Sequence, residues 1–117
     1  KNFMSNRSFQ LARDLHIAIC RDSETVPSEA QAQALYQLIH KQNQDELILR
    51  NQSIGPQTAQ ILSRKAEFMN LNVLDLYNNK IGDAGLPFIL KCRPKRINIG
   101  NNKLTNIGMA VLAQFIA

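Results

Sequence analysis

The residues with the chemistry for catalysis are two histidines, two cysteines and one pair of adjacent acids. His16 and His40 fall in segments of helical spacing, and neither is expected to have an acid or a cysteine beside it for a triad or a metal site. Asp45 and Glu46 are neighbours on an expected strand, where successive side chains point to opposite faces. The sequence therefore predicts a protein without enzymatic activity, metal site or cofactor.

A second group of residues with chemical potential is the basic run KCRPKR, which contains Lys91, Arg93, Lys95 and Arg96. Four cations in six residues have the charge to bind phosphates or to act as a nuclear localisation signal. The run has no interleaved aromatic side chain on which a base would stack. The simpler interpretation is an exposed loop with solvated charges, and nucleic-acid contact is the alternative.

The elements that position these residues follow a pattern that occurs three times. In the stretch 74–85, LDLYNNKIGDAG, Leu74 and Leu76 alternate with other residues as on a strand with one buried face. An asparagine, an isoleucine and two glycines follow, which indicates a turn and then a helix. The pattern recurs from Leu47 and from Ile97, so the steps are 27 and 23 residues, which indicates an array of similar units.

The corner after each strand requires side-chain hydrogen bonds, because no ladder satisfies the backbone groups there. Asn79 and Asn102 occupy this position in the second and third stretches, and Gln52 occupies it in the first. An amide both donates and accepts, so we predict a structural role for these three residues and a looser corner at Gln52. A further asparagine precedes each corner and predicts a ladder of side-chain hydrogen bonds. These are Asn51, Asn78 and Asn101.

The stretch 71–81, LNVLDLYNNKI, resembles the leucine-rich repeat L-x-x-L-x-L-x-x-N-x-L/I, and the IGDAG ending is similar to the ribonuclease-inhibitor type. The resemblance covers roughly residues 44–117, with Gln52 and Pro94 as departures. It implies an α/β fold, a right-handed leucine-rich repeat solenoid with a short parallel sheet and outer helices. Residues 1–43 lack the pattern and are predicted to form an N-terminal helical cap, or alternatively the degenerate tail of an earlier repeat.

The resemblance also implies where a partner binds, because members of this family usually use the concave face of the sheet. It implies a non-enzymatic scaffold for a protein partner, and arginine and tyrosine are over-represented at binding hot spots. The alternative is a family member that associates with nucleic acid or regulates a GTPase, through the basic loop or a repeat edge. The expected partner-binding residues are Ile48, Arg50, Asp75, Tyr77 and Asn98.

Helices are expected on both sides of the first strand. Apolar residues have approximately helical spacing over 8–20, and the polar segment 21–27 predicts a loop. Ser28 is a strong start signal for a second helix. The three strands are followed by helices expected over 56–68, 84–91 and 106–116.

Length, charge and cysteine content limit the remaining choices. The chain has 117 residues and a net charge of +5, which suits an acidic partner of any kind. It begins at Lys1 and ends in an apolar helix at Ala117, so we expect a fragment of a longer protein, or an open end that a partner or second copy covers. Two cysteines, Cys20 and Cys92, are too few for a disulfide framework. We therefore expect an intracellular protein without membrane contact, cytoplasmic or alternatively nuclear.

Overall fold

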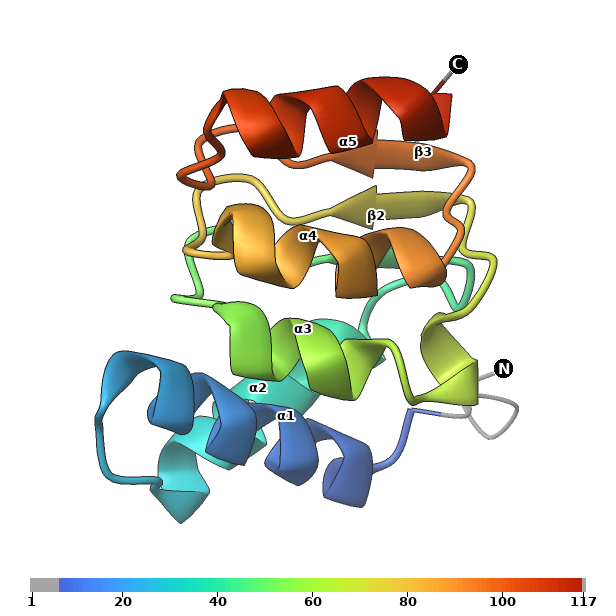
Figure 1. Cartoon of the computed structure of the whole chain (residues 1–117). Coiled ribbons are helices and arrows are strands. Elements are labelled where there is room, and N and C mark those ends of the chain that lie inside the picture. Colours follow the sequence, from blue (N-terminus) through green and yellow to red (C-terminus); the bar gives the residue numbers. More distant parts are fainter. Residues whose placement is uncertain (1–6, 117) are drawn as a thin grey trace.

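The computed structural model describes residues 7–116, which form five α-helices and a three-stranded parallel sheet (Figure 1). The strands lie in the order β1-β2-β3, with Leu47 opposite Leu74 and Leu74 opposite Ile97. Figure 1 shows α3, α4 and α5 side by side on one face of the sheet, and α1 and α2 beyond α3. The elements are α1 (Phe9–Ser23), α2 (Glu29–His40), β1 (Glu46–Ile48), α3 (Pro56–Leu62), the 3-10 helix η2 (Ala66–Phe68), β2 (Val73–Asp75), α4 (Gly82–Lys91), β3 (Arg96–Asn98) and α5 (Asn106–Ile116).

Serine side chains start the first two helices. Ser8 and Ser28 each accept a hydrogen bond from the backbone N–H three residues further on, at 3.2 and 3.1 Å. Such caps satisfy N–H groups that have no partner within the helix. Helix α1 continues past its expected end at Cys20 to Ser23, because Glu24 ends it in the left-handed conformation with φ 57°.

The helix expected over 56–68 is divided into two elements. Helix α3 ends at Leu62, and η2 follows as a separate turn that places Phe68 fully in the core. Helix α4 begins at Gly82, earlier than the expected residue 84. Pro87 therefore lies inside the helix, where it removes one backbone hydrogen bond.

One hydrophobic core joins the sheet to the helices. Leu47 and Leu74 point from the sheet into this core, and Leu86 packs on them from α4. Leu15 from α1 and Ile39 from α2 belong to the same cluster and are fully buried. Removing such side chains from water supplies about 1.5–3 kcal/mol each, so the N-terminal helices contribute directly to the core of the sheet.

The expectation of a right-handed leucine-rich repeat solenoid with an N-terminal helical cap is wrong. The described residues form a small mixed α/β domain of 39 × 33 × 20 Å, with five helices and only three strands of three residues each. Its radius of gyration is 13.6 Å, and a compact domain of this length has one of about 13 Å. A solenoid requires a longer series of stacked units, whereas 117 residues close into one globular core that includes α1 and α2.

Asp22, in the last turn of α1, holds the start of α3. Its carboxylate accepts hydrogen bonds from the backbone N–H groups of Gly55, Gln57 and Thr58 at 2.9, 3.0 and 2.9 Å, and from the Thr58 hydroxyl at 2.7 Å. A Cβ atom at Gly55 would lie 2.7 Å from Cγ of Asp22, so this close approach requires glycine. One carboxylate from a distant helix thus replaces a local cap.

We expect Asp22→Ala to lower the free energy of unfolding by about 2 kcal/mol, because four donors at the start of α3 lose their acceptor. Urea denaturation followed by circular dichroism measures this change. Glu67→Ala removes a carboxylate with no hydrogen bond or ion pair in the described structure and serves as the control, with an expected change within about 0.5 kcal/mol. Equal unfolding midpoints for the two variants would show that Asp22 does not stabilise α3.

Candidate functional site

Strand residues alternate between the core and the opposite side of the sheet. Leu47 and Leu74 are buried beneath the helices, whereas Ile48 and Tyr77 are 38% and 41% exposed. Because strand side chains alternate, these exposed side chains lie on the side of the sheet opposite the buried leucines, away from α3, α4 and α5. We call this surface the strand face, and it comprises Ile48, Arg50, Asp75, Tyr77 and Asn98.

Arg50, Asp75 and Tyr77 form one connected group on the strand face. Nε and Nη2 of Arg50 both donate to Oδ2 of Asp75, at 2.9 and 2.6 Å. The other carboxylate oxygen of Asp75 accepts from the Tyr77 N–H at 3.2 Å, and the guanidinium lies 5.5 Å from the centre of the Tyr77 ring. The hydrogen bond that Arg50 donates to Asp75 raises the pKa of Arg50, so its guanidinium is charged at neutral pH.

Asn98 occupies the next position across the sheet, in register with Asp75. Its Oδ1 accepts a hydrogen bond from the Gly100 N–H at 3.0 Å. Asp75 accepts the equivalent hydrogen bond from the Tyr77 N–H. A Cβ atom at Gly100 would lie 3.1 Å from the Tyr77 ring. The absence of a side chain at Gly100 therefore leaves room for the Tyr77 ring. One part of the ring packs against the Gly100 backbone, and the rest is exposed.

Gln42, which the sequence analysis did not single out, covers the free edge of β1. Its side-chain amide donates to the Ile48 carbonyl at 2.9 Å and accepts from the Ile48 N–H at 2.7 Å. An uncovered strand edge offers unpaired backbone groups to other chains. The contact fixes Ile48 at the border of the strand face. It could not be predicted from the sequence, because it depends on the path of the 41–45 loop.

Asn79 lies at the corner after β2 and is almost fully buried. Its Oδ1 accepts from the backbone N–H groups of Gln52 and Ile54, at 2.9 and 3.0 Å. Its Nδ2 donates to the carbonyls of Leu49 and Leu76, both at 2.9 Å. A longer contact of 3.3 Å joins Nδ2 to the Tyr77 carbonyl, so one side chain bonds to five backbone groups and ties the corner after β1 to the corner after β2.

The other two corner residues make different numbers of contacts. Oδ1 of Asn102 accepts from the Ile81 N–H at 3.2 Å, and its Nδ2 donates to the Leu76 carbonyl at 2.8 Å. Asn102 therefore links the second corner to the third. Gln52 is only half-buried, and its Nε2 donates to the Arg50 carbonyl at 3.0 Å within its own corner.

The predicted ladder of asparagines is confirmed. Nδ2 of Asn78 donates to Oδ1 of Asn51, and Nδ2 of Asn101 donates to Oδ1 of Asn78 at 2.5 Å. All three residues have positive φ angles, 60°, 59° and 53° in chain order, which asparagine adopts more readily than most residues. Backbone geometry and neighbouring side chains therefore explain these residues without a ligand.

The basic run lies apart from the strand face. It connects the end of α4 to the start of β3, and Nζ of Lys91 lies 5.3 Å from the centre of the Phe88 ring. Because the strands are parallel, the residues that precede them lie together at one end of the sheet. Arg50 and Tyr77 follow strands and therefore lie at the opposite end. The four exposed cations are Lys91, Arg93, Lys95 and Arg96.

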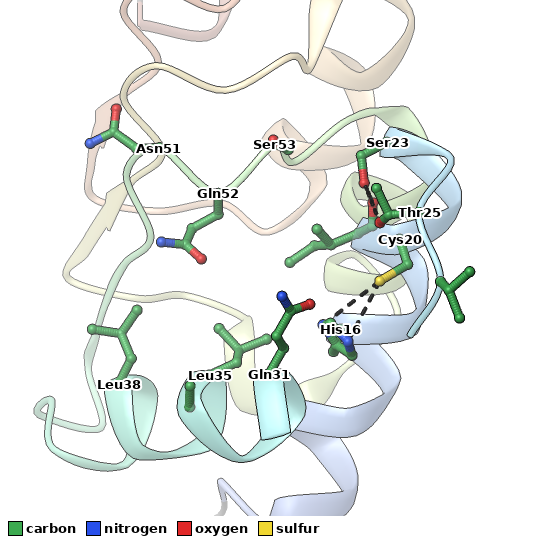
Figure 2. A pocket seen from close by; sticks show the side chains of 13 residues that line it. His16, Cys20, Ser23, Thr25, Gln31, Leu35, Leu38, Asn51, Gln52 and Ser53 are labelled. Atoms are coloured by element: carbon green, nitrogen blue, oxygen red, sulfur yellow. Dashed lines mark hydrogen bonds between the residues drawn. The ribbon is translucent and has the colours of Figure 1, made fainter. Parts of the chain in front are cut away.

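The side chain of Cys20 lies beside His16, one helical turn further along α1. Figure 2 shows His16 and Cys20 on one wall of a hollow of about 560 Å³, with residues 51–53 above α2 on another. Sγ of Cys20 lies 3.5 Å from Nε2 of His16, but the same nitrogen accepts a hydrogen bond from the Ser28 N–H at 3.1 Å. With that lone pair engaged, His16 is not placed to activate the thiol, and it joins α1 to the start of α2.

The remaining chemistry-bearing residues have structural contacts. His40 stacks on Tyr36 with ring centres 5.0 Å apart. Residues 7–116 contain no group of three or more histidine, cysteine or acidic side chains arranged to hold a metal ion. Each helix in this part of the chain is too short or too polar to cross a bilayer.

Comparisons of the chain with protein-family models, curated proteins and solved structures give no match. The likeness of residues 44–117 to the leucine-rich repeat family therefore stays a prediction from the motif.

We expect Asn79→Ala to lower the free energy of unfolding by about 2–4 kcal/mol, because it leaves several buried backbone groups unpaired. Chemical denaturation with a fluorescence or circular dichroism readout gives the value. Lys80→Ala truncates an exposed neighbour and is the control. A loss of less than about 1 kcal/mol for Asn79→Ala would contradict its role at the corner.

Proposed function

We propose that this chain is a non-enzymatic protein-interaction module that binds a protein partner through the strand face. The observation that carries the proposal is the ordered group of Arg50, Asp75 and Tyr77 on an exposed surface. Arginine and tyrosine are enriched among the residues that dominate binding free energy at protein interfaces. Here the two side chains lie next to each other beside an exposed isoleucine, Ile48.

Pre-ordering supports the proposal. Immobilising a flexible side chain at an interface costs about 0.5–1.5 kcal/mol, and arginine is among the most flexible. Arg50 is already held by Asp75, whose side chain is only 11% exposed and is itself bonded to the backbone. Folding therefore already restricts the Arg50 side chain, and a partner that contacts Arg50 and Tyr77 loses less binding free energy to side-chain ordering.

The chemistry of the strand face indicates what kind of partner surface fits. Ile48 and Tyr77 offer apolar area on either side of the Arg50 charge. A complementary surface would place an apolar side chain against these two residues and a carboxylate or carbonyl oxygen near the guanidinium. We therefore expect a partner with a mixed apolar and acidic patch.

We also propose a reducing intracellular compartment for the protein. Cys20 and Cys92 are both free and buried. Burial raises the pKa of Cys92 to about 11, so its thiol stays protonated and unreactive at neutral pH. Two free, buried cysteines that form no disulfide with each other are compatible with such a compartment.

The double variant Arg50→Glu, Tyr77→Ala is expected to lose at least about 90% of a captured partner, because both anchors of the strand face are removed. Affinity capture with quantitative mass spectrometry identifies the partner, and titration with the purified partner then gives the dissociation constants. The control Arg64→Glu, Leu38→Ala makes the same charge change and removes an exposed apolar side chain on the helices.

A second variant separates binding from stability, since Arg50→Glu places a second anion beside Asp75. Tyr77→Ala alone removes the aromatic anchor, adds no charge and leaves the Arg50–Asp75 pair in place. It is expected to weaken binding of the purified partner at least about tenfold with an unchanged circular dichroism spectrum. Full affinity in both folded variants would exclude the strand face as the binding site.

A further inference from the structure

The whole net charge of the chain comes from its C-terminal part. Residues 1–90 contain nine Lys or Arg and nine Asp or Glu, so their formal charges cancel, whereas residues 91–117 contain five cations and no acid. These five account for the net +5 of the chain, and such an asymmetry is typical of contact with an anionic polymer. The five cations are Lys91, Arg93, Lys95, Arg96 and Lys103, all of them exposed.

The cations of this part are not used for internal pairing. Within residues 7–116 the ion pairs involve Arg13, Arg50 and Lys65, which all lie in the neutral part of the chain. Lys91 has a structural explanation, since it lies at the end of α4 and over the Phe88 ring. The remaining cations have no such contact with a ring or a carboxylate in the described structure.

Two of these cations line a hollow together with an aromatic ring. The hollow has a volume of about 580 Å³ and is lined by Asn70, Arg93, Pro94, Lys95 and Phe115. Phe115 belongs to the last turn of α5, which ends beside the start of β3 (Figure 1). The basic run thus has an aromatic neighbour after all, and the fold supplies it from twenty residues further along the chain.

The backbone of this hollow is fixed. The Asn70 N–H donates to the Cys92 carbonyl at 2.8 Å, and the Lys95 N–H donates to the Leu71 carbonyl at 2.9 Å. Pro94, between the two cations, is buried. The segments before β2 and β3 therefore hold Arg93 and Lys95 at defined positions beside Phe115.

We propose that this hollow binds single-stranded nucleic acid, with phosphates on Arg93 and Lys95 and one base stacked on Phe115. Proteins that bind single strands combine a cationic groove with aromatic rings on which bases stack. Asn70 adds an amide that can donate to and accept from a base edge. A duplex keeps its bases stacked on each other and presents none to the ring, so a single strand fits the geometry better.

The proposed nucleic-acid site is independent of the strand face. The hollow lies where β2 and β3 begin, whereas Arg50 and Tyr77 follow the ends of β1 and β2. The two surfaces can therefore be tested separately. The double variant Arg50→Glu, Tyr77→Ala is expected to bind an oligonucleotide as the wild type does.

Fluorescence anisotropy with a labelled oligouridylate of about ten nucleotides tests the proposal. We expect binding at about 50 mM salt, with log K falling by about 1.4 per tenfold rise in salt for two phosphate contacts. Arg93→Ala and Lys95→Ala should each reduce this slope by about 0.7. Lys41→Ala, an exposed cation in the neutral part, is the matched control with no change of slope.

Phe115 gives the sharper test, because stacking does not depend on salt in the way that phosphate contacts do. Phe115→Leu should weaken binding at least about fivefold and leave the salt slope unchanged, and Phe115→Tyr should bind like the wild type. Phe9→Leu is the control for a partly buried ring elsewhere. If Phe115→Leu does not fold, a more than fivefold loss in Phe115→Tyr contradicts the stacking contact instead.

Three other outcomes would overturn the proposal. Absence of binding at about 50 mM salt excludes the site. Full affinity in Phe115→Leu would show that no base stacks on Phe115 and that only the charges of the basic run bind the oligonucleotide. Competition by polyglutamate as strong as that by unlabelled oligouridylate assigns the surface to an acidic protein segment.

Discussion

The side-chain amide of Asn79 is the interaction on which the arrangement of the sheet depends. Each strand has only three residues, so the ladder supplies few hydrogen bonds before the chain turns away. At the turns the backbone passes through left-handed conformations at Asn51, Ser53 and Asn78, and the amides of Gln52 and Ile54 donate to a side chain instead of to a neighbouring strand. Asn79 accepts from two backbone N–H groups there and donates to the carbonyls of both corners, and burial makes these bonds costly to lose. Asn102 carries the same connection to the third strand.

The strand face follows from this constraint. With the corners fixed, Arg50, two residues after β1, stays near the end of β2, and its guanidinium reaches Asp75 across the sheet. Asp75 in turn orients the backbone of Tyr77, and Gly100 leaves the space in which the ring lies. The core residues on the other side of the sheet do not determine which side chains stand on this face. Core packing therefore does not require an arginine at position 50 or a tyrosine at position 77. The proposed function explains these two residue types by binding to a partner.

Local chemistry could be predicted from the sequence, and the global assembly could not. The start of α2 at Ser28 and of α3 at Pro56 agree with the sequence because capping and proline effects act within one turn. The asparagine ladder was predictable because its members recur in register. The solenoid was wrong because a local strand-and-corner pattern does not specify how many units stack or whether flanking helices share the core. Contacts between distant segments were also missed, above all Asp22 on α3 and Phe115 beside the basic run.

Native-state hydrogen exchange at single residues tests the central claim most directly. The amides of Gln52 and Ile54 lie in a turn outside any strand, and both donate to Oδ1 of Asn79. If Asn79 holds the corner, these two amides exchange with free energies close to that of global unfolding, as the amides of the core do. If they exchange at the rates of the exposed 41–45 loop, the corner opens independently of the fold. Asn79 would then not be the residue that keeps the strand face in register.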